Sequence, residues 1–342
     1  MKRIIITLSF IICVLISFAQ TSGGMISRGG SKSKVSQSSS TVKRKPATSA
    51  RNLRTKRQAN TSKTKKRKKA KEEELPDITA EDCYQWGEQA FNSGNYQEAK
   101  DWYELAALDN HAESLYSLGF LYYNGLGVTQ DRVEAAKWYF EAANNGHTFA
   151  AYQLGIMFLT GEDIQEDKEA GFALMKLAAD SGQMDAKYIV GVLFEEGTGT
   201  TKDMNMARKY YDEAYDYLYN VARKAMKEQN GEQAVLYFES VLRTRQSVQS
   251  YDIKEIRTMC SLGYIYFHGM GTVTANNQQA YDWFDKASKA GSYEATFYMG
   301  MFYEWGYGVV EKKKKTAKKY YKASGYKYRT DVDNVILSSR YD

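Results

Sequence analysis

The chain has 342 residues, with 47 basic and 41 acidic side chains and a formal net charge of +6. This small net charge conceals two parts of opposite sign, because the first 71 residues hold 19 basic and no acidic residues, while the remainder carries a net charge of −13. With only three histidines and three cysteines, the sequence contains no H-E-x-x-H zinc motif, no paired C-x-x-C and no phosphate-binding loop. We therefore expect no metal, no cofactor and no catalytic site.

Residues 1–19 have the pattern of a secretory signal peptide. Two basic residues precede an apolar run over residues 4–18, and small residues stand three and one positions before Gln20. The run is shorter than the roughly 20 residues that span a bilayer, so no transmembrane span is expected after signal removal. We expect a protein exported to the periplasm or the outside of a Gram-negative cell. An uncleaved anchor or a buried terminal helix are the alternatives, and the basic residues that follow oppose translocation.

Residues 20–76 are predicted to be a disordered basic linker or arm. Residues 21–71 contain 17 Lys and Arg and no Asp or Glu, and they are rich in Ser, Thr and Gly. So few apolar residues cannot offset the conformational entropy of the chain. The arm is either a solvated linker or a site for polyanions that makes salt-sensitive contacts independent of sequence. The candidate polyanion-binding residues, in its densest part, are Lys63, Lys65, Lys66, Arg67, Lys68 and Lys69.

Residues 111–146 have the pattern of two antiparallel helices. In the first half, Leu115, Leu118 and Tyr122 recur at spacings of three and four, which places them on one apolar stripe of a helix. A Gly-x-Gly pair then ends this helix, since glycine reaches left-handed backbone geometry without a side-chain clash. Asp131 is a good N-cap for a second helix, which carries small and aromatic residues such as Trp138.

This unit recurs at intervals of 36 or 37 residues. A glycine inside the first helix marks each copy, at Gly119, Gly155, Gly191, Gly263 and Gly300. The N-cap of the second helix recurs as Asp131, Asp167, Asp203 and Asn276. A glycine inside a helix is unfavourable by roughly 1 kcal/mol against alanine, so we expect a neighbouring helix to approach closely there. A larger side chain, as in Gly155→Leu, is predicted to overpack the contact.

These residues resemble the Sel-1-like repeat, a longer-looped relative of the tetratricopeptide repeat. The match covers about residues 81–326 and implies an all-α fold, an α-solenoid of antiparallel helix hairpins over residues 77–326 with no sheet and a right-handed superhelix. Residues 81–110 look like a shorter tetratricopeptide-type copy. Residues 218–248 depart most from the pattern, because they lack the glycine inside the helix and the turn pair.

Residues 327–342 follow the last repeat and are predicted to be a C-terminal cap or tail. Within them, residues 331–337 contain aliphatic side chains that would cover the exposed apolar face of the terminal repeat. Cys83 and Cys260 lie about five repeats apart in an array where each repeat touches only its neighbours. They cannot pair within the chain, so we expect two buried or unpaired thiols.

The favoured function is a non-catalytic protein–protein interaction scaffold or adaptor of the cell envelope that binds a peptide or protein in the groove of the solenoid. The first helices of successive repeats are expected to line this groove. The position two before the in-helix glycine is mixed in character, as a ligand-binding surface would be, whereas the position two after it is apolar and predicted to be core. Ordinary solvent-facing positions are an equally good interpretation of the first set. The candidate partner-binding residues are Ser117, Gln153 and Ser261, with Asn124, Trp305 and Tyr307 at the rim.

A first alternative function is that of an envelope protein that binds polyanions through the arm. The resemblance also allows β-lactam hydrolysis, which has been associated with some secreted members of the family. The S-x-x-K motif of penicillin-binding serine enzymes occurs at residues 31–34 and 62–65. Both matches lie in the arm, where no fold places a nucleophile, so they are chance matches.

Tyr215, Tyr217 and Tyr219 interrupt the repeat pattern and are candidate exposed anchors for a partner.

Overall fold

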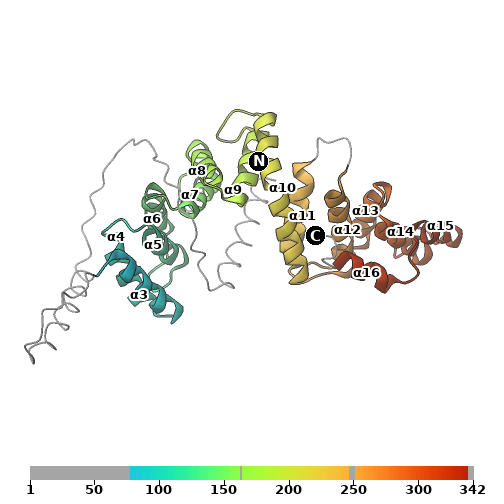
Figure 1. Cartoon of the computed structure of the whole chain (residues 1–342), viewed down its shortest axis with the longest axis horizontal. Coiled ribbons are helices and arrows are strands. Elements are labelled where there is room, and N and C mark those ends of the chain that lie inside the picture. Colours follow the sequence, from blue (N-terminus) through green and yellow to red (C-terminus); the bar gives the residue numbers. More distant parts are fainter. Residues whose placement is uncertain (1–77, 162–163, 246–250, 338–342) are drawn as a thin grey trace, which may run out of the picture. The chain divides into compact units, whose positions relative to one another are not determined.

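The computed structural model describes residues 78–161, 164–245 and 251–337. These residues form fourteen α-helices (Figure 1). The chain divides into two compact units, with the boundary in the sequence between residues 204 and 205. The part of the chain so described contains no β-strand, only an isolated bridge between Met270 and Val273. The predicted all-α fold of helix hairpins is therefore confirmed. The predicted signal peptide and basic arm, with Lys63, Lys65, Lys66, Arg67, Lys68 and Lys69, lie outside the described residues.

The first unit consists of successive hairpins. From α3 to α9, helices that are adjacent in the sequence pack against each other. The helices are α3 (Ala80–Asn92), α4 (Tyr96–Ala107), α5 (Ala112–Asn124), α6 (Arg132–Asn144), α7 (Thr148–Thr160), α8 (Lys168–Asp180) and α9 (Met184–Glu196).

The second unit continues the hairpins and adds a terminal helix. Its helices are α10 (Met204–Lys227), which begins at the boundary, α11 (Gly231–Thr244), α12 (Ile253–His268), α13 (Asn277–Lys289), α14 (Tyr293–Trp305), α15 (Lys314–Ser324) and α16 (Arg329–Leu337). Helices α11 to α15 pack in sequence order, and α16 packs against α12 and α14 (Figure 1).

The helix ends form where the sequence indicates them. The side chains of Asp131, Asp167 and Asn276 accept hydrogen bonds from backbone N–H groups in the first turns of α6, α8 and α13, at 2.9, 2.9 and 3.0 Å. Such a bond satisfies one of the four backbone donors that a helix start leaves without an intrahelical partner. Gly125 ends α5 with a φ of 69°, a left-handed conformation that costs a residue with a Cβ about 1 kcal/mol or more.

The in-helix glycines make room for a large side chain of the following helix. A Cβ on Gly119 would lie 2.5 Å from Cδ1 of Tyr139, and one on Gly263 would lie 2.8 Å from Cδ1 of Phe284. Gly155 instead faces the backbone nitrogen of Met175, 3.2 Å from an added Cβ. The predicted close approach at these glycines is confirmed, and it joins the two helices of one hairpin.

Helix α10 departs from the repeat pattern. The turn expected near residue 217 does not form, and one continuous helix of 24 residues joins the end of one copy to the start of the next. Tyr215 and Tyr219 lie on the buried side of this helix, each only 4% exposed, and Tyr217 is half-buried. The interpretation of Tyr215 and Tyr219 as exposed anchors is wrong, because the helix does not stop where the repeat register would end it, whereas Tyr217 keeps part of its surface accessible.

Within each unit, small and aromatic side chains between the helices form much of the core. The position two after each in-helix glycine is buried, as predicted, at Leu121, Met157, Leu193, Ile265 and Phe302. Cys83 and Cys260 are also buried, and Sγ of Cys260 lies 3.1 Å from Oγ of Ser292.

Candidate partner-binding surfaces

One side of each hairpin's first helix faces away from its partner helix. Counted from the in-helix glycine, the positions −6, −2, +1 and +5 share this side because they are spaced by three or four residues. We call it the A-helix face. It comprises Glu113, Ser117, Phe120 and Asn124 on α5; Phe149, Gln153, Ile156 and Thr160 on α7; Arg257, Ser261, Tyr264 and His268 on α12; and Glu294, Tyr298, Met301 and Trp305 on α14.

In the first unit, this face combines aromatic rings with polar groups. Phe120, Phe149 and Gln153 are half-buried, and Gln153 follows Phe149 by four residues on the same side of α7. The Phe120 ring lies 6.0 Å from the ring of Phe91 on α3, and the Phe149 ring lies 5.7 Å from that of Tyr116 on α5. Contacts between rings of neighbouring repeats therefore hold these side chains in place while leaving part of their surface accessible.

Two of the predicted groove residues do not face solvent. Ser117 is 1% exposed, and its hydroxyl donates a hydrogen bond to the carbonyl oxygen of Glu113 at 2.9 Å. Ser261 is 2% exposed. The expectation that these serines point into an open groove is wrong, because small side chains at the −2 position are covered by their larger neighbours. Of the three predicted groove residues, only Gln153 keeps accessible surface.

Of the three predicted rim residues, one is exposed and two are half-buried. Trp305, the last residue of α14, is 57% exposed, as expected for an aromatic anchor. Tyr307 is half-buried, with its ring 5.2 Å from that of Phe267, and its backbone oxygen accepts a hydrogen bond from Nδ2 of Asn277 at 3.1 Å. Asn124 is half-buried and its Nδ2 donates to the carbonyl oxygen of Phe120 at 2.9 Å. Tyr307 and Asn124 thus each have one polar group engaged in a hydrogen bond within the fold.

In the second unit, α16 lies on the A-helix face. The hydroxyl of Tyr298 donates a hydrogen bond to the Asp333 carboxylate of α16. Arg329 of α16 places Nη2 3.0 Å from both ring nitrogens of His268 and its guanidinium 5.5 Å from the ring centre of Phe267. The sequence pattern did not predict the contacts among these five residues. The only signal was Tyr298, an aromatic residue at a position where other copies carry small, polar or aliphatic ones.

The electrostatics of this contact suit a neutral histidine and a protonated tyrosine. Burial, followed by the Asp333 carboxylate, raises the pKa of Tyr298, so its hydroxyl keeps the proton that it donates. Burial, followed by the positive charge of Arg329, lowers the pKa of His268, so its ring stays neutral beside the guanidinium.

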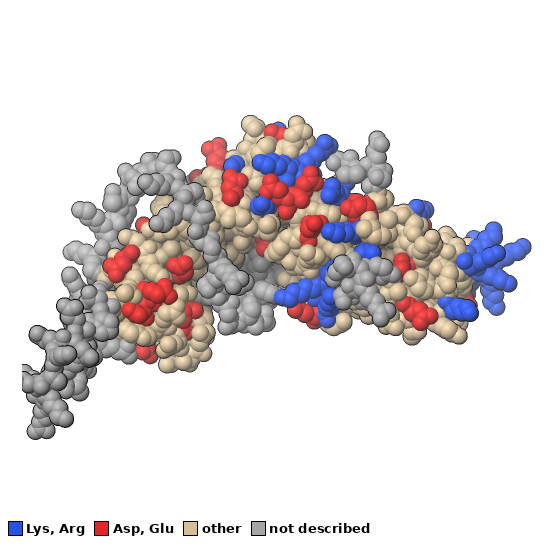
Figure 2. All heavy atoms as spheres, in the orientation of Figure 1, with Lys and Arg blue, Asp and Glu red and all other residues tan. Residues whose placement is uncertain are grey.

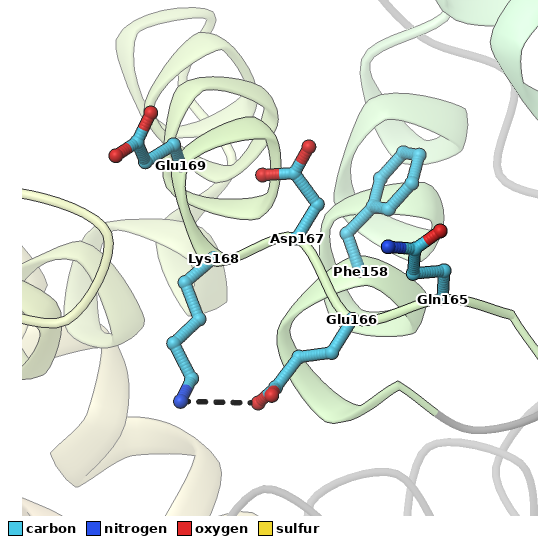
Figure 3. Close-up of a pocket in the computed structure, with 6 residues that line it drawn as sticks. All are labelled: Phe158, Gln165, Glu166, Asp167, Lys168 and Glu169. Atoms are coloured by element: carbon cyan, nitrogen blue, oxygen red, sulfur yellow. Dashed lines mark ion pairs between the residues drawn. The ribbon is translucent and has the colours of Figure 1, made fainter.

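A shallow hollow lies where α7 ends and α8 begins (Figure 3). Phe158, Gln165, Glu166, Asp167, Lys168 and Glu169 line it. Lys168 pairs with Glu166 at 3.2 Å, and Asp167 accepts the first backbone hydrogen bond of α8 from Ala170 at 2.9 Å. Figure 3 shows Glu169 pointing away from that ion pair. Asp167 thus caps α8, and Lys168 and Glu166 form an ion pair with each other. The residues that line the hollow do not form a pair of nucleophile and base.

The end of the second unit is strongly basic. Figure 2 shows lysines gathered over α15 and the loop before it. The exposed residues of this basic end are Lys312, Lys313, Lys314, Lys315, Lys318, Lys319 and Lys322. Lys313 pairs with Glu311 at 3.5 Å.

Among the described residues, no cluster of three or more His, Cys, Asp or Glu side chains is arranged to hold a metal ion. The helices of the same residues include none with the length and apolar character that crossing a bilayer requires.

The family model of the Sel1 repeat matches six segments of the chain, at residues 80–111, 112–147, 148–183, 185–216, 256–292 and 294–326. The chain belongs to the Sel1 repeat family. The first matched segment includes the copy that the sequence pattern alone placed with the tetratricopeptide repeats. Residues 217–255, which contain the second half of α10 and all of α11, are the internal stretch without a match.

Solved structures of Sel1 repeat proteins are similar to this chain. A protective antigen of uropathogenic Escherichia coli with an SLR fold is 24% identical, with a TM-score of 0.45, and the match covers 84% of this chain and 58% of that one. A Sel1 repeat protein from Oxalobacter formigenes is 25% identical, with a TM-score of 0.41 and coverage of 71% and 98%. This chain thus spans 58% of the length of the first structure. No curated protein matches the sequence at a significant level.

Proposed function

We propose that this Sel1 repeat protein is a non-catalytic scaffold that holds a protein or peptide partner on its A-helix face. Sel1 repeat proteins generally mediate protein–protein interactions. The observation that carries the proposal for this chain is the half-buried set of Phe120, Phe149 and Gln153 on the first unit. Partly exposed aromatic rings beside an amide are the side chains on which binding energy concentrates at protein interfaces.

Substitutions on α5 and α7 test this proposal. Phe120→Ala combined with Gln153→Lys removes one ring and places a charge on the same face. Capture of partners from the native envelope fraction should fall by about tenfold or more, as expected when an interface anchor is lost. The control is Phe140→Lys on α6, whose side chain is 50% exposed outside the A-helix face. Undiminished capture by the double variant, with its melting temperature unchanged, would remove this face from consideration.

The cell envelope is the proposed location, on the strength of the signal-peptide pattern in residues 1–19. N-terminal sequencing of the protein from its native host should then begin at Gln20. Recovery of Met1 from the soluble cytoplasm would contradict this location.

A second candidate function is polyanion binding through the basic arm. It is supported by the 17 basic and no acidic residues in 21–71. A chain without residues 21–71 should lose salt-sensitive binding to heparin or nucleic acid and still capture its protein partner. Loss of the protein partner on arm deletion would shift the function from the repeats to the arm.

A further inference from the structure

We propose that α12 and α14 form a binding site for an amphipathic helix of a partner protein, and that α16 occupies this site as an intramolecular substitute. The inference rests on the proposed function and names the kind of partner. Its first support is the position of α16. A helix that only covered the end of the array would pack on the last helix, α15, whereas α16 lies across the first helices of two successive repeats.

The apolar side of α16 inserts into this surface. Val332 is fully buried and Ile336 is 6% exposed, while the residues between them remain at least partly accessible. The two side chains are four residues apart, so they form one stripe of the helix. The surface therefore selects a helix with aliphatic residues at positions i and i+4, which is how a groove reads an amphipathic helix.

The polar contacts select a carboxylate beside that stripe. Asp333, at position i+1, accepts the hydrogen bond of the buried Tyr298 hydroxyl with one oxygen, and Arg329 Nε lies 3.3 Å from the other oxygen. Tyr298 is fully buried and its hydroxyl also lies 3.1 Å from Nε2 of His268, so an apolar residue in place of Asp333 would remove its charged acceptor and leave His268 as the other hydrogen-bond partner.

The C-terminal end of α16 is also bound, by an arginine of α10. Arg223 on α10 donates a hydrogen bond from Nη1 to the backbone oxygen of Ile336 at 2.7 Å. The last carbonyl groups of a helix have no intrahelical partner and carry partial negative charge. A guanidinium at this place favours any helix that ends there, whatever its side chains.

The tether makes exchange with an outside helix possible. α16 has nine residues, fewer than an isolated helix needs to be stable in water. Gly325 precedes it with a left-handed φ of 73°, and the connecting Lys327 and Tyr328 are exposed. A short connection keeps α16 near its site at a high effective concentration, so it competes with a partner helix without preventing its binding.

The experiment measures binding of a labelled synthetic peptide of residues 326–337 to the full chain by fluorescence anisotropy. The wild-type site is filled by α16 and should bind the peptide weakly. Ile336→Asp in the chain should release α16 and strengthen peptide binding by about tenfold or more. A peptide that carries both Val332→Asp and Ile336→Asp is the control and should bind neither chain.

A second, milder variant shows whether a change in peptide binding comes from release of α16 rather than from unfolding of the chain. Asp333→Asn in the chain retains the apolar stripe and weakens the contacts of Asp333 with Tyr298 and Arg329, so it should strengthen peptide binding by less than Ile336→Asp does. Equal peptide binding by wild type and both variants, or none by any of them, would overturn the proposal. A wild-type dimer that Ile336→Asp dissolves would also overturn it, because α16 would then belong to a second copy. If the peptide test fails while Phe120→Ala with Gln153→Lys still abolishes capture, only this inference falls.

Discussion

Gly119 leaves the space that the ring of Tyr139 fills between α5 and α6. Gly119→Ala would bring a methyl group to 2.5 Å from Cδ1 of this ring, which is fixed in a packed interior. Overpacking of this kind costs about 1–3 kcal/mol, more than the roughly 1 kcal/mol that alanine gains over glycine in a helix. We expect a lower free energy of unfolding, measured by urea denaturation of the chain.

A double-mutant cycle identifies the cause. Tyr139→Leu removes the ring, so Gly119→Ala should cost less in that background than in the wild type. Glu141→Ala, at an exposed position of α6, is the control and should change stability by less than about 0.5 kcal/mol. Equal costs of Gly119→Ala in both backgrounds would show that the ring is not the obstacle.

His147 is an N-cap that depends on its neutral form. Its Nδ1 accepts a hydrogen bond from the backbone N–H of Ala150 at 3.0 Å, and its ring stacks on that of Tyr116 at 4.4 Å. Burial lowers the pKa of His147 from 6.5 to about 4. The unfolded chain therefore takes up a proton at higher pH than the folded chain. The stability from this residue is complete above pH 6.5, and it is lost as the pH falls from 6.5 towards 4.

The loss over this pH window should reach up to about 3 kcal/mol, at 1.36 kcal/mol per pH unit. Asparagine is also a good N-cap but does not titrate, so His147→Asn provides the comparison. The free energy of unfolding of the variant should fall less steeply between pH 6.5 and pH 4 than that of the wild type. Parallel pH profiles would mean that His147 is protonated to the same extent in both states.

At this scale the sequence predicted the residues whose role is local. The turn glycines and the Asp and Asn caps depend on their own backbone, and the structure has them as expected. The sequence did not indicate His147 as an N-cap, because histidine is not among the residues that are usually preferred at this position. Ser117 was misplaced because its burial depends on side chains from other helices, which the repeat register does not specify.

At the scale of elements, a tyrosine of α10 contacts the start of α12, beside the ion pair of Asp216 and Lys254 that also joins these helices at 2.7 Å. The Tyr215 hydroxyl lies 2.8 Å from each carboxylate oxygen of Asp252 and donates to it. Asp252 in turn is the N-cap of α12 and accepts from the backbone N–H of Glu255 at 2.9 Å. A side chain on the continuous helix thus orients the start of the next repeat.

Tyr215→Phe should lower the free energy of unfolding by about 1 kcal/mol, the usual net contribution of one hydrogen bond with an exposed partner. Hydrogen exchange should also become faster in the first turn of α12, since its N-cap loses the group that orients it. Tyr251→Phe is the control, because that ring is 56% exposed. Unchanged exchange in α12 would show that Asp252 holds its position without Tyr215.

The sequence predicted the hairpins well and the exceptions poorly. A helix that continues through an expected turn requires only that no residue stops it, and residues 216–218 contain no glycine or proline. The missing turn pair marked residues 218–248 as atypical without showing that α10 would extend through them. The position of α16 was equally hidden, because Val332 and Ile336 fit the end of the array as well as they fit the A-helix face.

At the scale of the molecule, contacts are made mainly between helices adjacent in the sequence. Among the described residues, α16 joins the largest sequence separation, since it reaches α12 as well as α14, and Arg223 of α10 donates a hydrogen bond to its backbone. In such an array, stability is close to a sum over repeats and their nearest neighbours. A local defect should therefore spread only to the adjoining hairpins.

Hydrogen exchange of the whole chain tests this expectation. Gly119→Ala should speed amide exchange in α5 and α6 and, less, in α4 and α7, whereas α13 to α15 should exchange as in the wild type. Ile336→Asp is the converse variant and should affect α12 and α14 without affecting α5 to α8. Faster exchange in every helix after Gly119→Ala would mean that the chain unfolds as one cooperative body. The A-helix faces of its two units would then bind their partners in a coupled way, because order gained at one face would stabilise the other.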